Sequence, residues 1–393
     1  MHNITTTIAA YVSVLLLTMI SLSGGAIADT GESLLEQFPT PQQDFQKHIE
    51  EVRDYLLDTQ LESRTPADVN YNLPFEIRAD QSVPYRGKYL LIHGLNDSPA
   101  VWHDGARALV ERGYDVRAIL LPGHGNTPET QLDVSYEQWL DVARAQLAYW
   151  RSPDTPLHIG GFSLGGVIAT ILALENDDIQ GLFLFAPAYY STKNSLLRWA
   201  SLVSHFKPWV FGGMITEDNP TKYNSIPINA AAQYYKSAQY LQEIWGRRKL
   251  SMPVLMIATF DDSVVRVNSL RAIFQRHFSS KKRRLVLYGN DPHEVQPFEI
   301  MQTSHYPEYR ILNQSHMSMM MAPDNALFGT DGTQLVCNGN EWPVYSACLF
   351  YEGQPPRWHG AEGTESPDDV PMARTTFNPD FAEVFKLHDE VFE

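Results

Sequence analysis

A regular alternation of short apolar runs with segments of helical length, beginning near residue 88, constrains the fold of this chain most strongly. Runs of this kind fit strands that are buried on both faces of a sheet. Strands that alternate with helices predict an α/β protein with a mostly parallel central sheet flanked by helices. The expected strands are Tyr89–Ile92, Val116–Leu121, Leu157–Gly160, Leu182–Phe185 and Val254–Ile257.

The segment 189–250 interrupts this alternation. It is rich in aromatic residues in helix-compatible surroundings, among them Trp199, Phe206, Tyr234 and Trp245. We expect an inserted helical cap over the carboxyl edge of the sheet, between a first core part (29–188) and a second core part (251–393). Alternatively, the aromatic residues fill the core of a subdomain. The second part would end in a Pro-, Gly- and acid-rich surface loop at 352–371 and a closing helix.

The N-terminus has the pattern of a secretory signal. Residues 1–28 contain no Asp, Glu, Lys or Arg, and 8–22 is mostly apolar. This run is shorter than the roughly 20 residues that span a bilayer, and Ala26-Ile27-Ala28 fits a cleavage site. We therefore predict a signal peptide at 1–28, a mature chain from Asp29, and a periplasmic or secreted location. A short N-terminal membrane anchor is the alternative.

The charge balance and the two cysteines restrict the partners and the compartment. The formal net charge of −16 would repel a phosphate backbone, so we expect no nucleic-acid partner. An exported chain permits oxidation, and we predict a disulfide between Cys337 and Cys348. Two packed free thiols are the alternative. The sequence shows no zinc-ligand spacing around these cysteines.

Gly161-Phe162-Ser163-Leu164-Gly165 matches the pattern G-x-S-x-G. An apolar strand precedes it and a helix from Leu164 follows it, which is the context of a nucleophile elbow. The glycines are needed because side chains two residues on either side of the serine would collide in so tight a turn. We predict Ser163 as a nucleophile.

His93-Gly94-Leu95 follows the first long apolar strand. In a fold with a nucleophile elbow, this loop and the residue after the nucleophile supply backbone N–H groups to an oxyanion. The expected donors are the N–H groups of Leu95 and Leu164. His93 precedes the nucleophile in the chain and is assigned a structural role, and Asn96–Pro99 is interpreted as an ordinary turn.

Three motifs in this order resemble the α/β-hydrolase superfamily, and within it the branch of lysophospholipases and monoacylglycerol lipases. They are His93-Gly94-Leu95, Pro122-Gly123-His124-Gly125 and the stretch Gly161–Gly166. The resemblance covers about residues 85–320 and implies a mostly parallel sheet with a helical cap. It also implies that His124 is structural. The export signal and the long tail after residue 320 depart from the family pattern.

A serine nucleophile needs an acid and a base, which follow it in this order in the α/β-hydrolase fold. The acid should come after the strand that ends near Thr259, where Asp261 and Asp262 stand. The resemblance favours Asp262, because family members carry Asp, a small residue and then an apolar pair. Asp261 remains the alternative.

For the base, the sequence offers two main candidates after these aspartates. His293 follows the expected strand Leu285–Tyr288 at a suitable spacing. His316 follows a second strand-like run, Tyr309–Leu312, and opens an apolar stretch that would exclude water. Because its surroundings also resemble the His loop of some bacterial family members, we choose His316, with His293 as the alternative and His305 behind both.

These residues predict an exported serine hydrolase of carboxylic esters, with lipid-like acyl esters such as monoacylglycerols or lysophospholipids as substrates. The mechanism needs neither a metal nor an organic cofactor. Contact with a membrane surface and the oligomeric state are left open. Alternatives are a thioesterase, an aminopeptidase or amidase with an amine site at Glu217, Asp218 or Glu243, and a non-catalytic binding protein of hydrolase fold.

Overall fold

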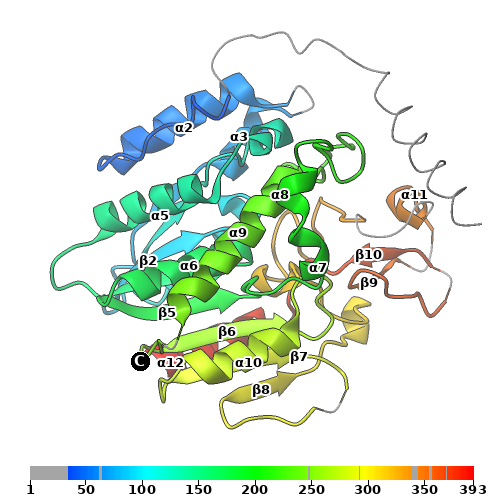
Figure 1. Ribbon diagram of the computed structural model, residues 1–393. Helices are drawn as coiled ribbons and strands as arrows, with labels where there is room; N and C mark the ends of the chain where they lie inside the picture. Colours follow the sequence, from blue (N-terminus) through cyan, green and yellow to red (C-terminus); the bar gives the residue numbers. More distant parts are fainter. Residues whose placement is uncertain are drawn as a thin grey trace, which may run out of the picture. The chain divides into compact units, whose positions relative to one another are not determined.

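Eight strands form the central sheet of the computed structural model (Figure 1). They are β1 (Phe75–Ile77), β2 (Gly87–Ile92), β3 (Tyr114–Ile119), β4 (Leu157–Phe162), β5 (Ile179–Phe185), β6 (Val254–Thr259), β7 (Arg283–Tyr288) and β8 (Glu299–Gln302). Their order is β1-β3-β2-β4-β5-β6-β7-β8. Only β1 and β3 pair antiparallel, and all other neighbours are parallel. The predicted fold class is confirmed.

The structure describes residues 34–61, 64–246, 248–291, 293–337, 344–353, 356–368 and 370–393. The predicted signal peptide and its cleavage site therefore lie outside the described residues. No helix within these ranges is both long and apolar enough to cross a bilayer.

Helices of very different lengths connect the strands. The α-helices are α2 (Phe45–Thr59), α3 (Pro66–Asn72), α4 (His103–Val110), α5 (Tyr136–Trp150), α6 (Leu164–Glu175), α7 (Asn194–Leu197), α8 (Ala200–Val203), α9 (Ile228–Trp245), α10 (Val267–His277), α11 (Val344–Leu349) and α12 (Phe381–Phe392). Short 3-10 turns are η1 (Pro99–Trp102), η2 (Pro128–Leu132), η3 (Pro307–Tyr309) and η4 (Ser318–Met320).

The sheet separates two hydrophobic cores because alternate strand residues point to opposite faces. In β2, Leu90 and Ile92 enter the core that contains residues of α5, α6, α9 and α10. Tyr89 and Leu91 enter the core on the other face, with residues of α4 and α12. Burial on both faces explains why the strand runs are continuously apolar.

Helix α6 begins directly after Ser163 and is buried along nearly its whole length. It packs on β4 and β5 on one side and on α9 on the other. A helix enclosed in this way is apolar all round, which matches its sequence. The serine at its start is therefore fixed to the most deeply buried helix of the described chain.

The segment 189–250 contains α7, α8 and α9. The aromatic residues of α9 are core residues, since Tyr234 and Trp245 are buried against α6 and the sheet. By contrast, Trp199 lies between the two short helices, Phe206 and Phe211 follow them, and all three are exposed. The aromatic residues of this segment thus divide between a buried and an exposed group.

Two sequence-based expectations near the C-terminus are wrong. The run Tyr309–Leu312 is not a sheet strand, because Arg310 has a left-handed φ of 52° that ends η3. The last sheet strand is instead β8, which the sequence analysis missed. The surface loop expected at 352–371 contains β9 (Trp358–Gly360), which pairs with β10 (Met372–Arg374).

The predicted disulfide between Cys337 and Cys348 is present, with the two Cα atoms 6.0 Å apart. Both cysteines are buried beside Ala373 of β10. The crosslink therefore joins the segment that ends at Cys337 to α11, which contains Cys348.

Candidate active site

Ser163 stands at a sharp turn between β4 and α6, with a positive φ of 53°. Its N–H donates to the carbonyl of Phe185, and its own carbonyl accepts from the N–H of Ala188. A Cβ on Gly161 would overlap the Gly165 carbonyl, and a Cβ on Gly165 would overlap the Ile92 carbonyl. The two glycines are therefore required by close backbone approach, as the motif predicts.

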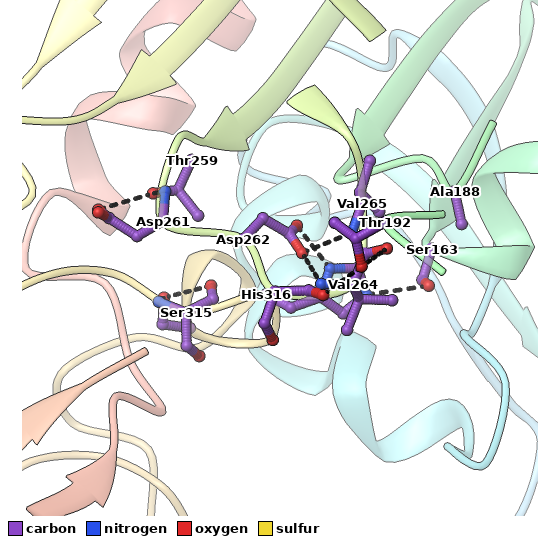
Figure 2. A network of polar contacts seen from close by, with 12 residues as sticks. Ser163, Ala188, Thr192, Thr259, Asp261, Asp262, Val264, Val265, Ser315 and His316 are labelled. Carbon is purple, nitrogen blue, oxygen red and sulfur yellow. Dashed lines mark hydrogen bonds and ion pairs between the residues drawn. The ribbon is translucent and has the colours of Figure 1, made fainter. Parts of the chain in front are cut away.

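Three side chains from distant parts of the chain form one line of hydrogen bonds (Figure 2). His316 Nε2 lies 3.0 Å from Ser163 Oγ, and His316 Nδ1 lies 2.7 Å from Asp262 Oδ2. In the tautomer that carries its proton on Nδ1, the ring donates to Asp262 and can accept the proton of Ser163. This is the geometry of a Ser-His-Asp triad.

Asp262 follows β6, and the carboxylate oxygen that does not contact His316 is hydrogen-bonded to the backbone. Its Oδ1 accepts from the backbone N–H groups of Val264 and Val265, each at 2.8 Å. Its side chain is fully buried. The two backbone hydrogen bonds therefore fix the carboxylate in place, with Oδ2 directed toward the imidazole of His316.

The alternative acid, Asp261, points away from this line (Figure 2). Its carboxylate accepts from the hydroxyl of Thr259 at 3.2 Å, and burial raises its pKa. Of the two aspartates, the structure therefore brings only Asp262 into contact with His316.

The loop of His316 is fastened on both sides of the histidine. The hydroxyl of Ser315 donates to the carbonyl of Thr375 at 2.6 Å, and the hydroxyl of Ser318 donates to the Ser315 carbonyl at 2.9 Å. The imidazole packs on the ring of Phe162 with centroids 5.1 Å apart. The following methionines are buried, as the predicted apolar wall requires.

Asp104 is a residue of this site that the sequence analysis missed. It lies on α4, is 7% exposed, and its Oδ2 accepts from the N–H of Ala322 at 2.9 Å and from Asn325 Nδ2 at 2.7 Å. The carboxylate thus anchors the far end of the His316 loop. No local motif marks it, because its partners lie more than two hundred positions away.

The loop after β2 carries Leu95, one of the two predicted oxyanion donors. Its neighbour Asn96 has a left-handed φ of 62°, and the backbone carbonyl of Asn96 accepts from the N–H of Tyr223 at 2.8 Å. Asp97 is close enough for electrostatic interaction with His316 and Lys222, although burial raises its pKa. This loop is more than the ordinary turn that the sequence analysis assigned. Leu164, the other predicted donor, is the first residue of α6.

Arg64 connects the loop after β3 with the segment 219–222. Its guanidinium is almost fully buried and donates to four backbone carbonyls at 3.2–3.3 Å. Two of them belong to Gly125 and Asn126, and two to Asn219 and Lys222. One side chain therefore joins the loop after β3 to the segment that supports Asn96.

The remaining histidines near the site have other surroundings. His293 stacks on Phe260 with ring centroids 3.8 Å apart, and His305 is exposed. His93 accepts from the N–H of Leu121, and burial lowers its pKa. Burial likewise lowers the pKa of His124 to about 4. Both are neutral structural groups, in line with the sequence-based assignment.

No group of three or more His, Cys, Asp or Glu side chains that could hold a metal ion occurs in the described ranges. An eight-stranded, mostly parallel sheet with a serine at the turn after its fourth strand defines the class of α/β hydrolases. The chain belongs to the Hydrolase_4 family, described as "Serine aminopeptidase, S33", which matches residues 84–300.

Two curated relatives match a shorter stretch. A pimeloyl-[acyl-carrier protein] methyl ester esterase of Aeromonas hydrophila is 38% identical over 90 residues, which are 23% of this chain and 33% of the relative. A thermostable monoacylglycerol lipase of a Bacillus species is 27% identical over 93 residues, 24% of this chain and 37% of the relative. The matches thus span about a third of these relatives.

Among solved structures, a soluble variant of the monoglyceride lipase of Saccharomyces cerevisiae resembles the chain with a TM-score of 0.45 at 17% identity. The match covers 58% of this chain and 85% of that one.

Proposed function

We propose that this protein is an exported serine hydrolase that cleaves carboxylic esters of lipid type through an acyl-enzyme. The hydrogen-bonded line from Asp262 through His316 to Ser163 is the observation that carries the proposal. The residues of this line were predicted from the sequence for these roles, and their catalytic action is what the proposal adds.

In the proposed reaction, Ser163 Oγ attacks the ester carbonyl while His316 Nε2 takes the hydroxyl proton. Asp262 stabilises the imidazolium that forms. The backbone N–H groups of Leu95 and Leu164 donate to the tetrahedral oxyanion. His316 then gives the proton to the leaving alcohol. A water molecule attacks the carbonyl of the acyl-enzyme while His316 takes its proton, and His316 returns that proton to Ser163 Oγ as the carboxylic acid is released.

The surroundings of the cap acids favour an ester over a substrate with a free amine. The Glu217 carboxylate accepts from the N–H groups of Asn224 and Ser225, at 2.8 Å and 2.6 Å. Asp218 accepts from Asn224 Nδ2 at 2.6 Å. Glu243 is exposed near the end of α9. Two of the three acids considered for an amine site are thus engaged in holding their own loop.

A lipid-like acyl group would suit the partly buried apolar side chains of Leu95, Tyr190 and Leu197, which pack on the same core as Leu164. The names of the Bacillus and Aeromonas relatives also refer to esters of glycerol or of an acyl chain. The class of substrate rests on these two observations together.

Labelling and a substrate panel test the proposal. A fluorophosphonate should label Ser163 in wild-type protein and leave Ser163→Ala unlabelled. Monoacylglycerols and lysophospholipids should be cleaved faster than a matched thioester and an amino-acid anilide. Labelling without turnover on any ester, or faster turnover of the anilide, would contradict the ester assignment, and absence of labelling in folded protein would contradict the nucleophile.

A further inference from the structure

An exposed apolar face occupies the first half of the cap segment. Half of the exposed large hydrophobic side chains in the described ranges fall between residues 196 and 215. Phe206 is 84% exposed, Leu196 68%, Phe211 62% and Leu202 59%. We call residues 193–215 the cap face. Such a concentration of exposed apolar side chains in one segment points to an interaction site.

The short helices of this face contribute little to the protein interior. No residue of α7 is buried, and Ala200 is the one buried residue of α8. Leu196, Leu202 and Val203 are exposed, whereas Leu197 packs on the core and Ala200 is buried. Removing the exposed side chains from water would be favourable only if another surface covered them.

The charge of the cap face is opposite to that of the whole chain. Lys193, Arg198 and Lys207 are exposed on it, and the sequence has no Asp or Glu from 189 to 216. The chain as a whole carries a net charge of −16. Apolar side chains interleaved with cations fit a surface that is both apolar and anionic. Two copies of this face would repel each other, which disfavours a second copy of the chain as the occupant.

The cap face is joined directly to the site. Just before it, the N–H of Ala188 donates to the Ser163 carbonyl, and Thr192 donates from its N–H to Val264 and from its hydroxyl to Ser263. Ser263 and Val264 follow Asp262 in the turn that holds the acid. The segment that leads into the cap face is therefore hydrogen-bonded to the backbone that carries the serine and the acid.

We propose that the cap face docks the protein on the surface of an anionic phospholipid membrane, so that ester substrates reach Ser163 from the lipid layer. This inference rests on the proposed ester hydrolysis for its purpose, but the docking itself is measurable without any turnover.

Vesicle co-sedimentation of the Ser163→Ala variant tests the docking. Binding should be stronger to vesicles that contain phosphatidylglycerol than to pure phosphatidylcholine, and should weaken as salt is raised. The triple variant Lys193→Gln, Arg198→Gln, Lys207→Gln should lose about a hundredfold in affinity for the anionic vesicles. Phe206→Ser with Phe211→Ser should weaken binding at least about tenfold to both kinds of vesicle.

Matched controls come from exposed residues elsewhere. Tyr85→Ser with Val295→Ser, and Lys281→Gln with Lys282→Gln, should bind vesicles like the parent protein. In the Ser163 background, all of these variants should hydrolyse a soluble acetate ester at the parent rate.

Equal binding by the cap-face variants and the controls, or no preference for anionic vesicles, would overturn the docking. Dimerisation through the cap face without vesicle binding would replace the membrane by a second copy. Failure of the proposed function has a different signature, because vesicle binding would persist while fluorophosphonate labelling and ester hydrolysis were absent.

Discussion

His316 Nδ1 lies 2.7 Å from Asp262 Oδ2, although the two residues are 54 positions apart in the chain. The contact joins the turn after β6 to a loop beyond the last sheet strand. Because Asp262 is itself fixed by two backbone N–H groups, it sets the orientation of the imidazole toward Ser163.

Replacing His316 by Ala should lower kcat on a soluble ester by about 10⁴-fold or more, because the imidazole that lies 3.0 Å from Ser163 Oγ is the group that takes its proton. Asp262→Asn should lower kcat to a similar degree by favouring the wrong tautomer. His293→Ala, on the alternative base, should keep near-normal turnover. Steady-state kinetics on folded variants measures all three, and a dead His293→Ala beside an active His316→Ala would reverse the assignment.

Gly165→Ala should destabilise the fold by at least about 3 kcal/mol and abolish activity, because its methyl group would overlap backbone carbonyl oxygens of Ile92 and His93. Gly213→Ala is the matched control, since a Cβ there meets nothing within 4 Å. Urea unfolding compares the two variants. Equal stability of both would show that the turn has room that the structure does not indicate.

Stability should fall in acid because buried histidines are held neutral. Burial lowers the pKa of His158 from 6.5 to about 3 and that of His124 to about 4. The unfolded chain therefore binds protons first as the pH falls. The contribution of these residues is complete above pH 6.5 and is lost progressively below it, at about 1.4 kcal/mol per pH unit for each histidine.

His158→Phe tests this dependence, because the ring already lies among aromatic side chains and stacks on Tyr89. The slope of unfolding free energy against pH below about pH 6 should fall by about 1.4 kcal/mol per unit in this variant. His205→Gln changes an exposed histidine and should leave the slope as it is. An unchanged slope in His158→Phe would mean that the pKa of His158 is the same in the folded and the unfolded protein.

Arg64→Gln should destabilise the protein by about 3 kcal/mol, because four buried carbonyl contacts lose their charged donor. It should also lower kcat/KM for a short ester, since the segment that positions Asn96 loses its attachment. Arg53→Gln, on the exposed side of α2, is the control. Thermal unfolding measures the loss of stability, and steady-state kinetics measures the loss of kcat/KM. A wild-type melting temperature together with a wild-type kcat/KM would refute the role of Arg64.

Export should remove residues 1–28, so the mass of the mature protein should correspond to a chain beginning at Asp29. The same spectrum, before and after reduction and alkylation, should show one disulfide between Cys337 and Cys348. A retained Met1 would favour the membrane-anchor alternative. Two thiols that alkylate without reduction would contradict the disulfide.

The sequence predicted those parts of the fold whose signals are local. The buried strands appear as apolar runs, and the turn at Ser163 appears as glycines at fixed spacing. The half-buried edge strand β8 lacks an apolar run and was missed. The run Tyr309–Leu312 reads as a strand in the sequence because the residue type of Arg310 does not indicate its left-handed conformation.

The site could be predicted only where a motif or the family resemblance marked it. His316 was chosen partly because it followed the supposed strand Tyr309–Leu312, so part of that reasoning failed although the structure places His316 beside Ser163. Asp104 and Arg64 act on backbone groups that are distant in the chain. Such contacts depend on the finished fold, and no short pattern announces them.

The fastening of Ser315 to Thr375 has a consequence for the order in which the protein becomes active. During synthesis, the turn of Ser163 emerges long before His316, and Thr375, whose carbonyl accepts from Ser315, emerges later still. A chain that ended before residue 316 would lack the imidazole that contacts Ser163 Oγ. The contacts that hold the His316 loop are thus complete only when the segment around Thr375 has joined the fold.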